Sequence, residues 1–147
     1  MPADTDQTRR LAADAAVTAG MLDTGRVILR VSGATLLVTL VVWLMGHPVH
    51  RGALVAVAAL AAAQLYFAER VRFDADIFRL WASRWHHDAD PAADLAAFDA
   101  RVGRQTPPAA SLDADLADRR QGARRLLRRQ AICGALQLTL SALALWT

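Results

Sequence analysis

The sequence has one cysteine and no lysine. All 17 basic residues are arginine, and 13 of the 14 acidic residues are aspartate. The lone cysteine, Cys133, excludes a disulfide framework or a cysteine-rich metal site within one chain. The bias toward arginine is typical of a GC-rich genome, so we base no argument on arginine having been chosen over lysine.

Sequence signatures of catalysis are also missing. The chain contains no Gly-rich phosphate loop, no Gly-x-Ser-x-Gly, no His-Glu-x-x-His and no Cys-x-x-Cys. Its carboxylates are scattered over polar stretches, with isolated i, i+4 pairs such as Asp115 with Arg119. The sequence therefore predicts a non-enzymatic protein with no catalytic residue and no cofactor, and no motif assigns it to a family.

Three long windows carry no aspartate, glutamate or arginine. They are 31–50, 52–68 and 130–147, with 20, 17 and 18 residues. A helix needs about 20 apolar residues to cross a bilayer, with a lower limit near 17. Because the chain is 54% apolar with a mean hydropathy of +0.21, we expect an all-α integral membrane protein. The alternative is a soluble domain in which these windows are buried core helices.

The expected transmembrane helices are 27–46, 53–68 and 131–147. The polar segment before the first contains three arginines, the short loop after it one, and residues 69–130 twelve. Basic segments stay on the cytoplasmic side of a membrane. We therefore predict a bacterial inner-membrane protein with a cytoplasmic N-terminus, a cytoplasmic segment 69–130 and an extracytoplasmic C-terminus. No cleavable signal peptide is expected, because the first apolar run follows about 26 polar residues.

The cytoplasmic segment is predicted to be helical. Without a helix breaker after residue 68, the second span should continue to Trp85, with an apolar stripe at Phe73, Ile77, Trp81 and Trp85. The two longest pieces, 69–85 and 111–129, match in length and are expected to form a helical hairpin with a short third helix beside it.

Local signals mark where the helices of this segment begin and end. Asp90 followed by Pro91 is a favourable helix start, and Gly103 is a favourable end. A linker containing two prolines follows, and Ser111 should cap a last helix of about 35 residues.

The N-terminal residues 1–26 have two interpretations. Leu11, Ala15, Thr18 and Leu22 recur at helical spacing, which predicts a weakly amphipathic helix that could lie on a surface. A disordered tail is the alternative, since most of these side chains are small.

Small and amide side chains are the expected contacts between the membrane helices. Ala56, Ala59 and Ala63 form a smooth face that lets another backbone approach closely. Gln64 and Gln137 lie at similar predicted depth on neighbouring helices. We therefore expect a hydrogen bond between these two amides.

The run of arginines before the last span predicts contact with the lipid bilayer. Arg124, Arg125, Arg128 and Arg129 are expected to bind lipid headgroups. Nucleic acid is not expected, because the run adjoins a predicted span.

A weak metal-site candidate consists of His86, His87 and Asp90. His86 and Asp90 have i, i+4 spacing, but adjacent histidines point about 100° apart on a helix. Asp90 is also better used as a helix cap.

The leading functional hypothesis is an accessory or scaffold subunit that binds another protein. Phe78, Trp81, Trp85 and Phe98 are large apolar residues on a cytoplasmic part that should be too small to bury all of them. One alternative is a small transporter or ion-responsive protein that oligomerises through the alanine face. A weaker alternative is a metal-handling protein that uses the two adjacent histidines.

Overall fold

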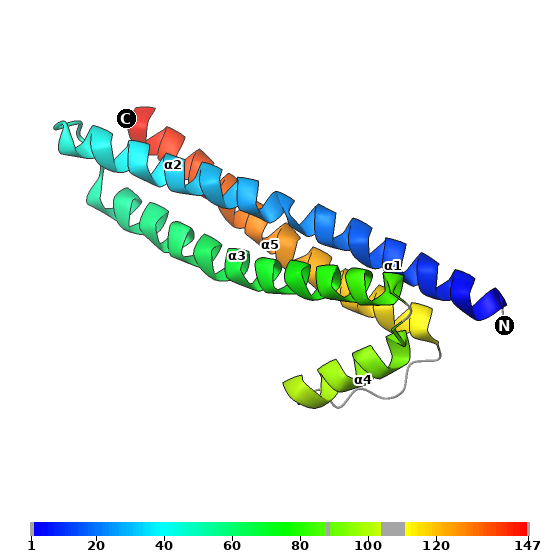
Figure 1. The fold of residues 1–147 in the computed structure, drawn as a ribbon. Helices are drawn as coiled ribbons and strands as arrows, with labels where there is room; N and C mark the ends of the chain where they lie inside the picture. Colours follow the sequence, from blue (N-terminus) through cyan, green and yellow to red (C-terminus); the bar gives the residue numbers. More distant parts are fainter. Residues whose placement is uncertain (1, 88, 104–110, 147) are drawn as a thin grey trace. The chain divides into compact units, whose positions relative to one another are not determined.

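The computed structural model describes residues 2–87, 89–103 and 111–146, and within them every regular element is an α-helix (Figure 1). The all-α class predicted from sequence is confirmed. The helices are α1 (Pro2–Leu22), α2 (Thr24–Leu44), α3 (Arg51–His86), α4 (Pro91–Val102) and α5 (Leu112–Trp146).

The chain forms two compact units. Unit 1 comprises Met1–Leu22 and Phe73–Arg124, and unit 2 comprises Asp23–Arg72 and Arg125–Thr147. The long helices α3 and α5 therefore each contribute one part to each unit.

The helix ends follow the local signals in the sequence. Asp90 caps α4 by accepting a hydrogen bond from the Ala92 amide at 2.9 Å, and Gly103 ends the helix in the left-handed conformation with φ of 66°. The Ser111 hydroxyl accepts a hydrogen bond from the Ala114 amide at 3.2 Å, which caps α5. The expected linker at 104–110 lies outside the described residues.

Two helical stretches of the described chain are long and apolar enough to cross a membrane, judged by length and composition. They are Thr5–Leu44, which includes most of α1 and all of α2, and Arg51–His86, which is α3. The third expected span, 131–147, is not among them. The third crossing stays a prediction.

Unit 1 buries one face of each helical segment that builds it. In α3 the buried residues are Ala75, Phe78, Trp81 and Trp85, and in α1 they include Leu11, Ala15 and Leu22. Leu95 of α4 and both Leu116 and Ala123 of α5 complete the core. The stripe predicted in the N-terminal segment is thus a helix face buried in this unit.

The stripe predicted for α3 is partly wrong. Phe73 is 50% exposed, and Ile77 is only half-buried. A strict spacing of four residues rotates about 40° per step around a helix with 3.6 residues per turn, so it leaves the buried face. The steps of three and four from Ala75 through Phe78 to Trp85 stay on it.

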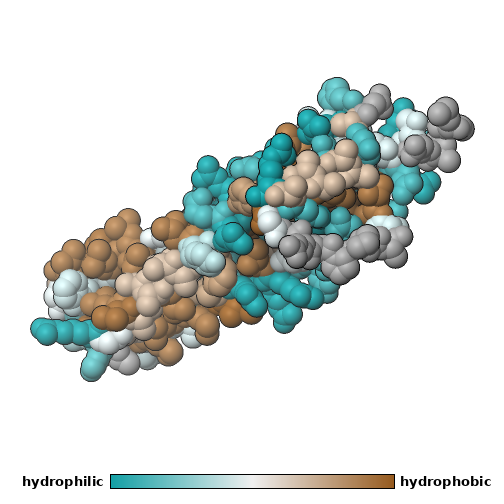
Figure 2. Space-filling view, turned by 90° about the horizontal axis from the view of Figure 1, so that it is seen from below, coloured by the Kyte–Doolittle hydropathy of each residue, from teal (hydrophilic) through white to brown (hydrophobic). Residues whose placement is uncertain are grey.

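Unit 2 has a core with many polar side chains. Its buried residues include Ser32 and Thr39 of α2, Gln64 of α3, and Gln130 and Gln137 of α5. The face seen in Figure 2 is largely hydrophobic over these helices, whereas hydrophilic side chains gather over unit 1. Polar groups inside and apolar groups outside are the arrangement expected of helices packed within lipid.

The alanine face of α3 is not its packing face within unit 2. Ala59 is exposed, and Ala56 and Ala63 are half-buried. The buried positions are Val57, Gln64, Ala68 and Val71, on an adjacent side of the helix. The approach of another backbone to these alanines therefore stays a prediction, and within unit 2 the buried side of α3 carries other, mostly larger, residues.

Candidate partner-binding groove

Trp81 lies at the centre of an aromatic cluster in unit 1. Its ring stacks on Trp85 with centroids 5.7 Å apart, and it meets Phe78 and Phe98 edge-on at 5.4 Å. The guanidinium of Arg119 lies 5.6 Å from the ring centroid of Trp81 and 5.7 Å from that of Phe98. The cation and the rings together join α3, α4 and α5.

Arg119 is buried and neutralised by two carboxylates. Its guanidinium donates to Asp99 of α4 at 2.7 Å and to Asp115 of α5 at 3.1 Å. Burial alone would lower the pKa of Arg119, but the hydrogen bonds to the two carboxylates and their negative charge outweigh it and raise the pKa. The guanidinium therefore stays charged inside this core.

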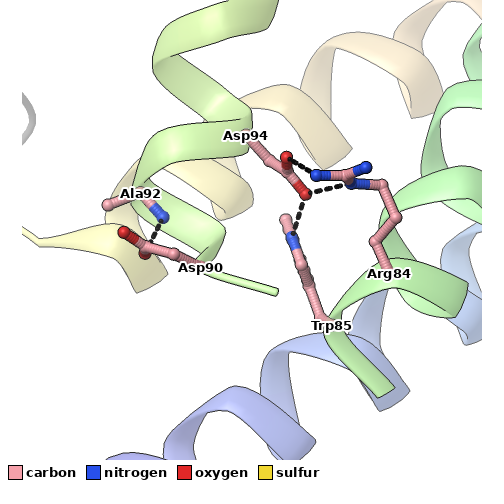
Figure 3. Close-up of polar contacts among 5 residues, drawn as sticks. All are labelled: Arg84, Trp85, Asp90, Ala92 and Asp94. Atoms are coloured by element: carbon pink, nitrogen blue, oxygen red, sulfur yellow. Dashed lines mark hydrogen bonds and ion pairs between the residues drawn. The ribbon is translucent and has the colours of Figure 1, made fainter. Parts of the chain in front are cut away.

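Asp94, near the start of α4, forms hydrogen bonds with residues at the end of α3 (Figure 3). Its two oxygens accept hydrogen bonds from the Arg84 guanidinium at 2.8 Å each, and one also accepts from the Trp85 indole N–H at 3.1 Å. The hydrogen bonds to Asp94 and its negative charge raise the pKa of Arg84. This contact sets the distance between the two helices at one end of unit 1.

The predicted partner surface is largely the interior of unit 1. Phe78, Trp81 and Trp85 are 3%, 4% and 1% exposed, and Phe98 is half-buried. The expectation that this segment cannot cover its large apolar residues is wrong for the first three. That expectation included only residues 69–130. The same unit also contains α1, which adds a fourth helix with a buried face.

A groove between α3 and α4 does expose apolar side chains. It has a volume of about 490 Å³. On α3 it is lined by Phe73, Ile77 and Leu80, which follow at i, i+4 and i+7, and on α4 by Phe98 and Val102. Phe73, Leu80 and Val102 are 50%, 53% and 51% exposed. The sequence pattern places Phe73, Ile77 and Val102 on apolar helix stripes that were expected to be buried, and it gives no signal for Leu80.

The groove has a positive edge. Arg84 and Arg101 line it together with Asp94. Arg84 is already paired with Asp94, whereas Arg101 is exposed and forms no ion pair with any residue that the structure describes. One arginine is thus available to a negatively charged group at the edge of an apolar hollow.

No protein-family model, curated protein or solved structure matches the chain. The groove must therefore be interpreted from its own geometry.

His86 and His87, the histidines of the weak metal-site candidate, make other contacts in the structure. The rings of His86 and His87 meet edge-on with centroids 5.5 Å apart, and Nδ1 of His87 is 2.8 Å from the Ser83 carbonyl oxygen. Asp90 caps α4. Among the described residues no group of three or more potential ligands could hold a metal ion, and Asp88 lies outside those residues.

The four arginines expected at lipid headgroups are on the surface. Arg124, Arg125, Arg128 and Arg129 are all exposed on α5, and none pairs with a carboxylate of the described chain. Their contact with lipid stays a prediction.

The expected hydrogen bond between Gln64 and Gln137 is absent from the structure. Gln137 instead accepts from the Ser32 hydroxyl and donates to the Ser32 carbonyl oxygen at 3.0 Å. Gln64 is fully buried, and neither amide atom has a hydrogen-bond partner among the described residues. Its amide lies against Gly134, where a Cβ would overlap it. Similar predicted depth does not determine which way a side chain points around its helix.

Replacing Gln64 with leucine is therefore expected to stabilise the protein, whereas replacing Gln137 with leucine should destabilise it. An unpartnered buried amide costs about 1 kcal/mol or more, and a satisfied one contributes about as much. Thermal unfolding of the full chain in one detergent measures both variants. If both substitutions destabilised the protein equally, the two amides would be bonded to each other after all.

Proposed function

We propose that the protein is a non-enzymatic bacterial inner-membrane protein whose cytoplasmic unit binds a partner protein. In this arrangement residues 27–46, 53–68 and 131–147 cross the membrane, the N-terminus is cytoplasmic and the C-terminus extracytoplasmic. Two helices of sufficient length and hydropathy and twelve arginines in residues 69–130 support it. Unit 1 is then the cytoplasmic unit, built around a hairpin of the extensions of α3 and α5.

The groove between α3 and α4 is the proposed binding site. Three of its apolar side chains are half exposed in water, which is costly unless another apolar surface covers them. Two rows of anchors, one from each helix, are the pattern that accommodates the apolar face of an amphipathic helix. Arg101, which has no ion-pair partner among the described residues, favours a helix with an acidic flank.

The alternatives have less support from the geometry. The exposed Ala59 is consistent with an oligomeric transporter that assembles through the alanine face. The three charge-free windows, however, contain no aspartate, glutamate or arginine that could form a transport path at mid-membrane. Metal handling by His86 and His87 lacks a third ligand among the described residues.

A photoreactive amino acid at Leu80 tests the groove in intact cells. We expect a discrete cross-linked adduct with one partner protein, because Leu80 lies in the groove and is exposed. Val17 on α1 is 71% exposed and lies outside the groove, so the same probe there is the matched control and should give no such adduct.

A second substitution connects the adduct to the groove. Val102→Glu in the Leu80-labelled protein places a charge on the opposite wall and should reduce the adduct at least tenfold, since burying an unpaired carboxylate costs more than about 1.4 kcal/mol. An adduct of equal yield from Val17, or one that persists with Val102→Glu, would show that the groove is not the binding site.

A further inference from the structure

A second groove follows α2 and α5 on the outside of unit 2. It consists of two adjoining hollows of about 260 and 400 Å³, which share Val31 and Leu138 as lining residues. The side chains along it are apolar or small. Ala131 and Ala135 of α5 and Ala34 of α2 leave the space that larger side chains would fill.

Contacts between α2 and α5 show how the two helices are aligned. Gln130 donates to the Gly25 carbonyl oxygen at 2.7 Å, and Gln137 bonds to Ser32. Both residue numbers increase together, so the helices run parallel. Arg30 therefore lies at the level of Ala135, about 7.5 Å further along the axis than Gly25.

Helical spacing places Arg30 beside the residues of α2 that line this groove. It follows Val27 by three residues and precedes Ala34 by four, and both of these line the groove. Its side chain is exposed, and no carboxylate of the described residues pairs with it. Arg26, one turn earlier, is already paired with Asp23 at 3.6 Å. Inside a membrane span an exposed arginine is costly unless it reaches a phosphate or a carboxylate.

We propose that an anionic phospholipid binds here, with its phosphate on the Arg30 guanidinium and one acyl chain along the α2–α5 groove. The arginine presents planar paired donors to the phosphate oxygens. The apolar groove along α2 and α5 has a shape and polarity that suit an acyl chain. This inference rests on the proposed crossing of the membrane by α2 and α5.

The charge at the groove distinguishes a lipid from a second copy of this chain. Two copies facing each other across the groove in the same membrane orientation would bring two Arg30 side chains to the same depth. Like charges at low dielectric repel, so a dimer through this face is unfavourable. A phospholipid instead supplies the missing negative charge and the apolar chain in one molecule.

Native mass spectrometry of the full chain released from detergent micelles tests the site, with phosphatidylglycerol or phosphatidylcholine added as the probe. We expect selective retention of phosphatidylglycerol. Arg30→Gln should weaken it about fivefold, the effect of losing one arginine near an anionic surface. Ala135→Leu, which fills the groove, should also weaken it. Arg9→Gln and Ala62→Leu are matched controls at exposed positions outside the groove and should retain the lipid as the wild type does.

Each contrary result has a distinct meaning. Equal retention of both lipids, or undiminished phosphatidylglycerol retention by Arg30→Gln, overturns the site. An effect of Arg30→Gln without one of Ala135→Leu overturns the placement of the acyl chain. If Arg30→Gln fails to fold, Arg30→Lys keeps the charge and must keep most of the selectivity. Recovery of the wild-type protein from the soluble fraction of cells would overturn both the proposed topology and the lipid site. If the protein is extracted from membranes but retains no lipid, only the lipid site is overturned, and the proposed binding of a partner protein in the α3–α4 groove is unaffected.

Discussion

Replacing Arg119 with methionine should lower the free energy of unfolding of unit 1 by about 3 kcal/mol. The substitution keeps much of the side-chain volume but removes the cation from between Asp99 and Asp115. Two partly buried carboxylates would then face each other without a counterion, and the contacts with Trp81 and Phe98 would be lost as well. Hydrogen exchange of the full chain, followed for peptides from α4 and the first half of α5, measures this local stability.

The neighbouring arginine provides the matched control for this experiment. Arg120 pairs with Asp14 of α1, whose side chain is 54% exposed. A water-accessible pair contributes only about 0.5 kcal/mol, so Arg120→Met should change the exchange rates little. Equal effects of the two substitutions would show that the buried position of Arg119 gives it no special role.

Replacing Trp85 with alanine should destabilise unit 1 by about 3 to 5 kcal/mol. Trp85 is 1% exposed and stacks on Trp81, so the substitution leaves a large cavity inside the core. It also removes the indole N–H that donates to Asp94. Thermal unfolding of the full chain in detergent, followed by far-ultraviolet circular dichroism, measures the loss.

Trp85→Phe separates the packing of Trp85 from its hydrogen bond. Phenylalanine fills much of the space but cannot donate to Asp94, which still accepts two hydrogen bonds from Arg84. We expect a loss of about 1 to 2 kcal/mol. A phenylalanine variant as unstable as the alanine variant would mean that the hydrogen bond, and not the volume, dominates.

The parts of the fold that depend on neighbouring residues are the ones the sequence predicts well. Asp90, Gly103 and Ser111 end or begin helices through contacts within a few residues, and the absence of a breaker after residue 68 is enough to predict that α3 continues. The face on which a helix packs depends instead on partners far away in the chain. Phe73 was assigned to the wrong face of α3 for this reason.

The candidate sites show the same division. The exposed arginines and the apolar spacing of Phe73 and Ile77 are visible in the sequence, but the groove also requires Val102, which belongs to another helix. Trp81 and Trp85 are buried in a unit that also contains α1, which is separated from them by more than 50 residues of sequence. Composition alone could count the large apolar residues but could not show that α1 completes their core.

Unit 1 is built from two separate segments of the chain, and this restricts the path of the chain through a membrane. Its first segment ends at Leu22 and its second begins at Phe73, and Gln7 bonds to Asp113 at 3.1 Å within it. Both segments must therefore be on the same side of any bilayer. Residues 23–72 can then cross it only an even number of times, a parity rule that does not depend on counting arginines. If α2 spans the membrane, α3 must return across it, and the two crossings are inserted or lost together.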